Sequence, residues 1–189
     1  MKLVEFERLV GLARYAPTSV DWEALERRIG LRLPQDYRRI FQMYPDLQIG
    51  KFLGIFSPPS NVDDYVRQNN EVMEPLRDLA QDEITLLDGT EEGRLITPYP
   101  FYPERSGLLP WGATENGEVC LWLTDKENSN EWPIIVTDGL GYWRYDGNIL
   151  SFVGDLLSGN VTCPIFPDDF PENDRIDQFE VDADRESSR

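Results

Sequence analysis

Apolar residues in the first third of the chain recur every three or four positions, the spacing that lays one hydrophobic stripe along a helix. Residues 18–21 resemble a capping box before the second stripe, and Gly30 ends that stripe. Pro34 and Pro45 bound the third stripe, and Pro75 limits a longer helix that starts near residue 60. The pattern predicts helices over residues 3–13, 22–29, 34–44, 60–79 and 148–157.

Between residues 94 and 146 the apolar spacing shifts toward two, which indicates strands. Asn116-Gly117 stands between two apolar runs, a strong signal for a hairpin whose two turn positions both need positive φ. We therefore expect three to five mostly antiparallel strands in this region and another strand over residues 51–56. Residues 80–93 are acidic and contain glycine, so we expect a loop there.

The chain of 189 residues is long enough for one domain and too short for two ordinary ones. We expect a single domain over residues 1–163, with an α+β fold in which short helices flank a central, mostly antiparallel sheet. Residues 164–189 hold nine acidic residues and three Arg, with few large apolar side chains. This segment should be a flexible acidic tail or a strap held by Phe166, Phe170 and Phe179.

The charge of the chain is strongly negative. Lys and Arg number 18 and Asp and Glu 35, which leaves a formal charge of −17. A field of that sign repels phosphates and anionic lipids, so we expect neither nucleic acid nor a membrane as a partner. Residues 1–8 lack the apolar stretch of a signal peptide, and no run approaches the roughly 18 apolar residues that span a bilayer. We expect a cytoplasmic protein.

The chain contains no His. This absence excludes Ser-His-Asp and Cys-His catalysis and imidazole metal ligands. Cys120 lies inside an apolar run, where burial would raise the pKa of its thiol, and no CxxC motif occurs. Cys120 and Cys163 fit either two free thiols or one disulfide. We expect no catalytic residue, no cofactor and no metal site.

Carboxylate pairs leave one catalytic alternative, a hydrolase that works with two acids. Asp63-Asp64, Glu91-Glu92 and Glu115 with Glu118 are candidate pairs, but a chain this acidic produces such neighbours by chance. Residues 125–131 carry oxygen ligands without the central Gly and the spacing of a calcium loop. Most of these acids should therefore lie on a solvated surface.

Aromatic side chains gather in the predicted sheet region. They could stack against a sugar or a base, form the layer between sheet and helices, or anchor a protein interface where they are exposed. The negative charge argues against a nucleic-acid base. The residues are Trp111, Trp122, Trp132, Trp143, Tyr99, Phe101, Tyr102, Tyr142 and Tyr145.

Two blocks of the chain resemble the SUKH superfamily, which includes bacterial immunity proteins and fungal cell-wall regulators. The first block is Ile29-Gly30-Leu31-Arg32-Leu33-Pro34-Gln35-Asp36-Tyr37 with Phe41. The second is Leu109-Pro110-Trp111-Gly112-Ala113-Thr114-Glu115-Asn116-Gly117-Glu118 with Cys120-Leu121-Trp122, followed by Trp132-Pro133-Ile134-Ile135-Val136 and Ser151-Phe152-Val153. The resemblance covers residues from about 20 to 160 and includes no clear counterpart for residues 60–107.

The resemblance implies a SUKH-like fold with a set of structural motif residues. Pro34 would start a helix, Tyr37 and Phe41 would share its buried face, and Trp111 would pack on Trp122 across the hairpin. The motif residues expected to determine the fold are Leu33, Pro34, Tyr37, Phe41, Trp111, Asn116, Gly117, Trp122, Trp132 and Phe152.

The resemblance also implies a non-enzymatic protein that binds another protein, above all an immunity protein that neutralises a polymorphic toxin such as a nuclease. An acidic protein can steer onto the basic cleft of such a toxin domain and occupy it. The alternatives are a regulatory or scaffold module without a toxin partner and the carboxylate-dependent hydrolase. Nothing in the sequence fixes an oligomeric state. The acids expected to contact the partner are Glu115, Glu118, Asp125, Glu127, Glu131, Asp82, Glu83, Glu91 and Glu92.

Overall fold

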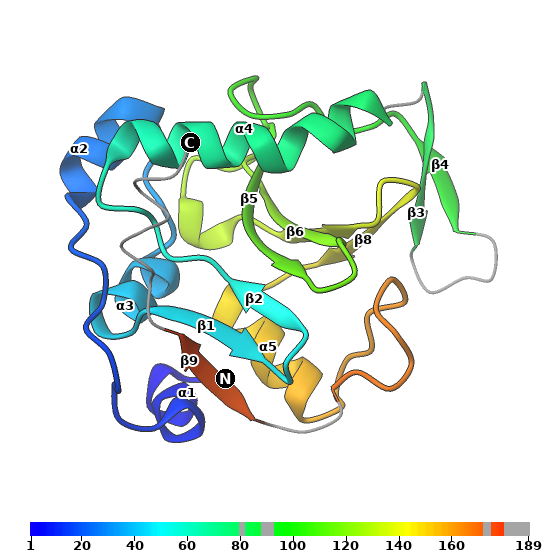
Figure 1. Ribbon diagram of the computed structural model, residues 1–189. Helices are drawn as coiled ribbons and strands as arrows, with labels where there is room; N and C mark the ends of the chain where they lie inside the picture. The colour runs from blue at the N-terminus through cyan, green and yellow to red at the C-terminus, as the bar shows by residue number, and fades with distance from the viewer. Residues whose placement is uncertain (80–81, 88–92, 172–174, 180–189) are drawn as a thin grey trace.

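A computed structural model describes residues 1–79, 82–87, 93–171 and 175–179. Within these ranges, five α-helices and a nine-stranded sheet form the α+β fold that the sequence predicts (Figure 1). The helices are α1 (Leu3–Val10), α2 (Trp22–Ile29), α3 (Gln35–Met43), α4 (Val62–Asp78) and α5 (Ile149–Leu157). The strands are β1 (Asp46–Ile49), β2 (Leu53–Ile55), β3 (Ile84–Leu87), β4 (Arg94–Ile96), β5 (Leu108–Thr114), β6 (Val119–Leu123), β7 (Ile134–Thr137), β8 (Gly141–Tyr145) and β9 (Ile176–Phe179).

The sheet runs in the order β4-β3-β8-β7-β6-β5-β2-β1-β9. Its pairs are antiparallel except for β3 with β8, which is parallel. Five strands fall between residues 94 and 146, and β2 falls within 51–56, so these predictions are confirmed. The mostly antiparallel character of the sheet is confirmed as well.

Both faces of the sheet are covered. Cys120 and Trp122 of β6 face the larger core, which also holds side chains of α1, α2, α3 and α5. Leu121 of the same strand faces a second core with Met73 and Leu76 of α4. Figure 1 shows α4 lying across one side of the sheet and α5 behind it. Because successive side chains of a strand point to opposite faces, this alternation buries β6 along its whole length.

The helices lie close to where the sequence places them, with differences at their ends. Helix α1 ends at Val10, because Gly11 takes a φ of 77° and breaks the stripe before residue 13. The capping box predicted at residues 18–21 does not form. Asp21 alone caps α2, since its Oδ1 accepts the Ala24 N–H at 2.9 Å, whereas the Thr18 hydroxyl lies 3.4 Å from Ser57 Oγ.

The hairpin predicted at Asn116-Gly117 is confirmed as the β5–β6 turn, but the turn is wider than expected. The Thr114 N–H donates to the Glu118 carbonyl oxygen at 2.9 Å, which leaves Glu115, Asn116 and Gly117 inside the turn. Of the pair, only Gly117 has a positive φ, 100°. The prediction that both positions need positive φ is therefore wrong, because in a three-residue turn the last position alone enters that region.

The sequence pattern does not predict β1, β3 or β9. The prediction of a loop over residues 80–93 is wrong at Ile84–Leu87, where β3 pairs with β8. Each of the three strands has four residues. A run that short carries little periodicity of its own, and its pairing partner supplies the hydrogen bonds that define it.

The C-terminal segment contributes to the fold as far as Phe179. Phe166 and Phe170 pack on Phe52, with ring centroids 5.6 and 4.8 Å away, and Ile176 is buried where β9 pairs with β1. Phe179 is 46% exposed, so it does not hold the segment down as expected. The boundary of an independent domain at residue 163 stays a prediction, and residues 180–189 of the expected tail lie outside the described residues.

Candidate functional site

The β5–β6 turn carries two of the acids expected to contact a partner. Glu115 is exposed, and its Oε1 accepts a hydrogen bond from Gln48 Nε2 at 2.5 Å. Glu118 is half-buried. Its carboxylate accepts a hydrogen bond from the Thr114 hydroxyl, and its backbone N–H donates to Thr114 Oγ1 at 3.1 Å. Glu118 thus serves the turn itself, which leaves Glu115 as the more accessible carboxylate here.

The β6–β7 connection carries three further candidate acids. Glu127 and Glu131 are exposed, and Glu131 accepts a hydrogen bond from Asn128 Nδ2 at 2.7 Å. Asp125 is half-buried. Trp132 holds this connection against the core, because its ring is buried while its Nε1 donates to the Lys126 carbonyl oxygen at 2.7 Å. The connection therefore presents Glu127 and Glu131 from a fixed backbone.

The remaining candidate acids belong to the region predicted as a loop. Asp82 and Glu83 are exposed and directly precede β3. Glu91 and Glu92 lie outside the described residues.

The fold does not gather these acids into one cluster. Strand β6 separates the β5–β6 turn from the β6–β7 connection, so Glu115 and Glu127 lie at opposite ends of five residues, about 17 Å of extended chain. Strand β8 begins at the same end of the sheet as β6, and β3 runs parallel to β8. Asp82 therefore lies toward the end that carries Glu115, and a partner that contacts one end need not reach the other.

The motif residues of the two resembling blocks form the layer between the sheet and the helices. The Tyr37 ring centroid lies 4.9 Å from those of Phe41 and Trp122. The Trp122 centroid in turn lies 6.2 Å from Trp111 and 6.4 Å from Trp132. All of these rings are buried. Trp111, Trp122 and Trp132 therefore cannot provide a stacking platform for a sugar or a base, and their role is to pack the core.

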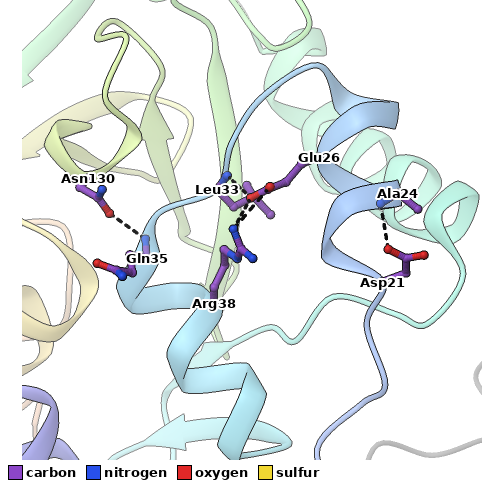
Figure 2. Close-up of polar contacts among 7 residues, drawn as sticks. All are labelled: Asp21, Ala24, Glu26, Leu33, Gln35, Arg38 and Asn130. Atoms are coloured by element: carbon purple, nitrogen blue, oxygen red, sulfur yellow. Dashed lines mark hydrogen bonds and ion pairs between the residues drawn. The ribbon is translucent and has the colours of Figure 1, made fainter.

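Polar contacts around the first motif block join α2 to α3 (Figure 2). Glu26 of α2 accepts hydrogen bonds from the Leu33 N–H at 3.0 Å and from Arg38 Nη1 at 3.2 Å. Arg38 of α3 also stacks over Trp22, with its Cζ 5.5 Å from the ring centroid. The Gln35 N–H donates to Asn130 Oδ1. This last hydrogen bond ties the motif block to the β6–β7 connection.

Asp36 is the buried carboxyl of the same block. Its Oδ2 accepts the Leu150 N–H at 3.3 Å, at the N-terminal end of α5. Burial raises the pKa of Asp36 above its ordinary value of 3.8, and the backbone hydrogen bonds oppose that rise. The geometry makes Asp36 a cap for a neighbouring helix, not a group open to substrate.

Nucleophilic chemistry finds little support among the described residues. Cys120 and Cys163 are free and buried, and burial raises the pKa of both thiols, to about 12 for Cys163. The described part of the chain holds no group of three or more Cys, Asp or Glu placed to bind a metal ion. Within the same ranges, no helix has the length and apolar character needed to cross a bilayer.

The candidate carboxylate pair Asp63-Asp64 is neutralised by cations. Asp63 pairs with Arg28 at 3.2 Å, and Asp64 pairs with Arg67 at 2.8 Å. Both acids begin α4, beside an open groove of about 660 Å³ in which Arg67 also pairs with Glu71 at 3.1 Å. Because the two carboxylates engage different cations, they do not face each other as a two-acid hydrolase requires.

A further surface feature, which the apolar pattern of the sequence does not predict, lies where α4 meets the β7–β8 turn. Leu79 and Leu140 are 48% and 66% exposed there, beside a small apolar hollow. The signal that could have found it is a lone Leu within the polar turn Asp138-Gly139-Leu140-Gly141. Exposed leucines next to an apolar hollow form a contiguous apolar surface, which is a candidate contact surface.

Comparison with known proteins gives one family. The family model SUKH_6, described as SMI1-KNR4 cell-wall, matches residues 20–147. No curated protein and no solved structure matches the chain. The matched range starts just before α2 and ends after β8, so it spans the first motif block and the sheet from β1 to β8. It covers the second block as far as Val136 and does not include Ser151-Phe152-Val153.

Proposed function

The chain belongs to the SUKH superfamily, in the family described as SMI1-KNR4 cell-wall, and from this premise we propose that it is a non-enzymatic immunity protein that binds and neutralises a basic toxin domain. The family membership supports a SUKH-type module, and the toxin partner is our proposal. Binding would occur in the cytoplasm of the cell that makes the protein.

The observation that carries the proposal is the surplus of solvated carboxylates. The chain has 17 more acids than cations. The ion pairs found among the described residues use Glu26, Asp63, Asp64, Glu71, Asp146 and Asp177. The exposed candidates Asp82, Glu83, Glu115, Glu127 and Glu131 take part in none of these pairs. Their charge is therefore available to a partner.

A basic cleft is the surface that such charge fits. A toxin that acts on nucleic acid needs cationic side chains to bind phosphates, and an acidic protein competes for the same cleft. Long-range attraction would accelerate the encounter, and the contact would exclude substrate. Because the acids lie at two ends of the sheet, one end makes the contact while the other contributes to steering.

The proposal is tested with the polypeptide encoded by the adjacent reading frame, produced in an inactivated form. We expect it to co-purify with the wild-type chain at low salt and to dissociate as the salt concentration rises, because the Debye length shrinks. The variants Glu127→Lys/Glu131→Lys and Asp82→Lys/Glu83→Lys reverse the charge at the two ends separately. Asp168→Lys/Asp169→Lys makes the same change of net charge at two other exposed acids and is the matched control.

Loss of binding in one of the first two variants, with retention in the control, would support the proposal. No binding by the wild-type chain would favour a regulatory or scaffold module without a toxin partner. Turnover of a glycoside or another small substrate, abolished by changing one acid, would favour the hydrolase instead.

A further inference from the structure

A small apolar hollow lies between the C-terminal end of α4, β3 and the β7–β8 turn. Its space is about 20 Å³, close to what one water-sized sphere needs. Apolar and aromatic side chains make up most of its lining. The lining residues used below are Leu76, Leu79, Ile84, Phe101, Gly139 and Tyr142.

Leu79 lines this hollow, and Leu140 directly follows the lining residue Gly139 in the β7–β8 turn. Both leucines are exposed. Asp138 Oδ1 accepts the N–H groups of Leu140 and Gly141, both at 2.9 Å, so the turn that presents Leu140 is rigid. Leu79 approaches the same turn so closely that a Cβ at position 139 would lie 2.7 Å from its Cδ1. Gly139, with a φ of 88°, permits this approach. We call Leu79, Leu140 and the hollow between α4 and the turn the Leu140 patch.

Four exposed acids lie close in sequence to residues that line the hollow. They are Asp78, Asp82, Glu83 and Asp138, each within two positions of a residue that lines the hollow. Two cations lie at similar positions in the sequence, fewer than the four acids. Arg77 stacks over Phe101 with its Cζ 5.6 Å from the ring centroid, and Arg144 pairs with Asp146 at 2.8 Å. The patch therefore combines an apolar centre with an acidic rim.

We propose that the Leu140 patch is the surface on which a basic amphipathic segment of the partner docks, with an apolar side chain against Leu79 and Leu140 and Lys or Arg side chains against the rim. This inference rests on the proposed function and names the contact surface for it. Apolar centres surrounded by polar rims are the usual anatomy of protein interfaces. The acidic rim favours a partner with positive charge. The leucines supply the apolar surface that loses contact with water on binding.

The charge distribution selects this occupant over the others. A second copy of the chain would bring another charge of −17 and the same acidic rim, and like charges placed together oppose association. The hollow is too small to enclose a drug-sized ligand, which needs several hundred Å³. A protein segment needs no such cavity, because it covers the exposed leucines from outside.

The test measures the affinity and the association rate of the inactivated polypeptide from the adjacent reading frame for four variants. Leu140→Ser and Leu79→Ser remove apolar contact, and we expect each to weaken binding about tenfold. Asp82→Lys/Glu83→Lys reverses the rim, and we expect the association rate at low salt to fall about tenfold. Leu12→Ser is the matched apolar control, because Leu12 is 92% exposed and its carbonyl contacts Gln178 of β9, the strand farthest from β4 in the sheet order.

Thermal unfolding of each variant checks that it is folded. We expect the leucine variants to fold, because the substituted leucines are exposed. Binding by Leu140→Ser, Leu79→Ser and Asp82→Lys/Glu83→Lys within about twofold of the wild type, while the wild type binds, would overturn the inference and leave the proposed function intact. A stronger loss in Leu12→Ser than in Leu140→Ser would also overturn it. Failure of the wild-type chain to bind would overturn the proposed function and this inference together.

Discussion

Asn130 caps a helix that begins 95 residues earlier in the chain, because its Oδ1 accepts the Gln35 N–H at 2.7 Å. Helix α3 begins after Pro34, which has no side-chain hydrogen-bond group to satisfy the first N–H groups. The cap therefore comes from the β6–β7 connection, as Figure 2 shows. The first motif block is thus tied to the β6–β7 connection, which directly precedes Trp132 of the second block.

Replacing this cap should measure that dependence. We expect Asn130→Ala to lower the free energy of unfolding by about 1 kcal/mol, the usual effect of losing an N-cap acceptor. Asn130→Asp should restore most of the loss, because it keeps an acceptor and places negative charge at a helix N-terminus. Urea unfolding of the three proteins compares them. Equal midpoints for Asn130→Ala and the wild type would show that water replaces the cap at no cost.

The buried carboxyl of Asp36 should give the protein a specific pH dependence. Its pKa is raised on folding by burial, so the folded chain holds this proton at pH values where the unfolded chain has released it. The contribution of Asp36 to stability is therefore complete below pH 3.8 and is lost as the pH rises through the raised pKa. Asp36→Asn keeps an oxygen for the Leu150 N–H and removes the titration.

We expect the free energy of unfolding of Asp36→Asn, relative to the wild type, to increase between pH 3 and 7. Urea unfolding at several pH values in that range gives the difference directly. Asp169→Asn, at an exposed acid, reports the effect of removing one negative charge alone. A relative stability that stays flat or falls with rising pH would contradict the assignment of Asp36 as a buried carboxyl destabilised by its ionisation.

The aromatic layer should dominate stability. Trp122 is buried between Tyr37, Trp111 and Trp132, so Trp122→Ala should cost roughly 3–5 kcal/mol. Trp143 is half-buried, and the same substitution there should cost clearly less. Chemical denaturation measures both. A larger loss at Trp143 would mean that the motif residues are not the centre of the core.

The strand β9 should be required for full stability. We expect a chain that ends at residue 163 to be at least about 3 kcal/mol less stable than a chain that ends at 179, since Phe166 and Ile176 each bury an apolar side chain. Gln178→Ala in the full chain should cost about 1–2 kcal/mol, because Gln178 Nε2 donates to the Val10 and Leu12 carbonyl oxygens. Equal unfolding midpoints for the two shortened chains would place the domain boundary at 163, as the sequence predicts.

Long periodic segments of this chain are predictable from sequence alone. Helix α4 and the β5–β6 hairpin carry enough apolar repeats to identify both their type and their position. Strands β3 and β9 do not, because each has four residues and exists through pairing with a strand distant in sequence. The acidic flanks of Ile84–Leu87 made the segment resemble a loop.

In the candidate site, too, some features are predictable from sequence and others are not. The exposure of Glu115, Glu127 and Asp82 follows from their polar surroundings in the sequence. Their separation between two ends of the sheet depends on the direction of β6 and on the parallel pairing of β3. The Leu140 patch depends on α4 ending against the β7–β8 turn, a contact between segments far apart in sequence. Local sequence patterns do not predict a contact of this kind.

We propose that this acidic SUKH protein acts by docking on a basic protein partner. The association rate with the inactivated polypeptide from the adjacent reading frame, measured by stopped flow from low to high ionic strength, tests this proposal. We predict a rate that falls steeply as salt is added, because screening removes the attraction between opposite charges. A rate that does not change with salt, or the absence of any complex at low salt, would contradict the claim.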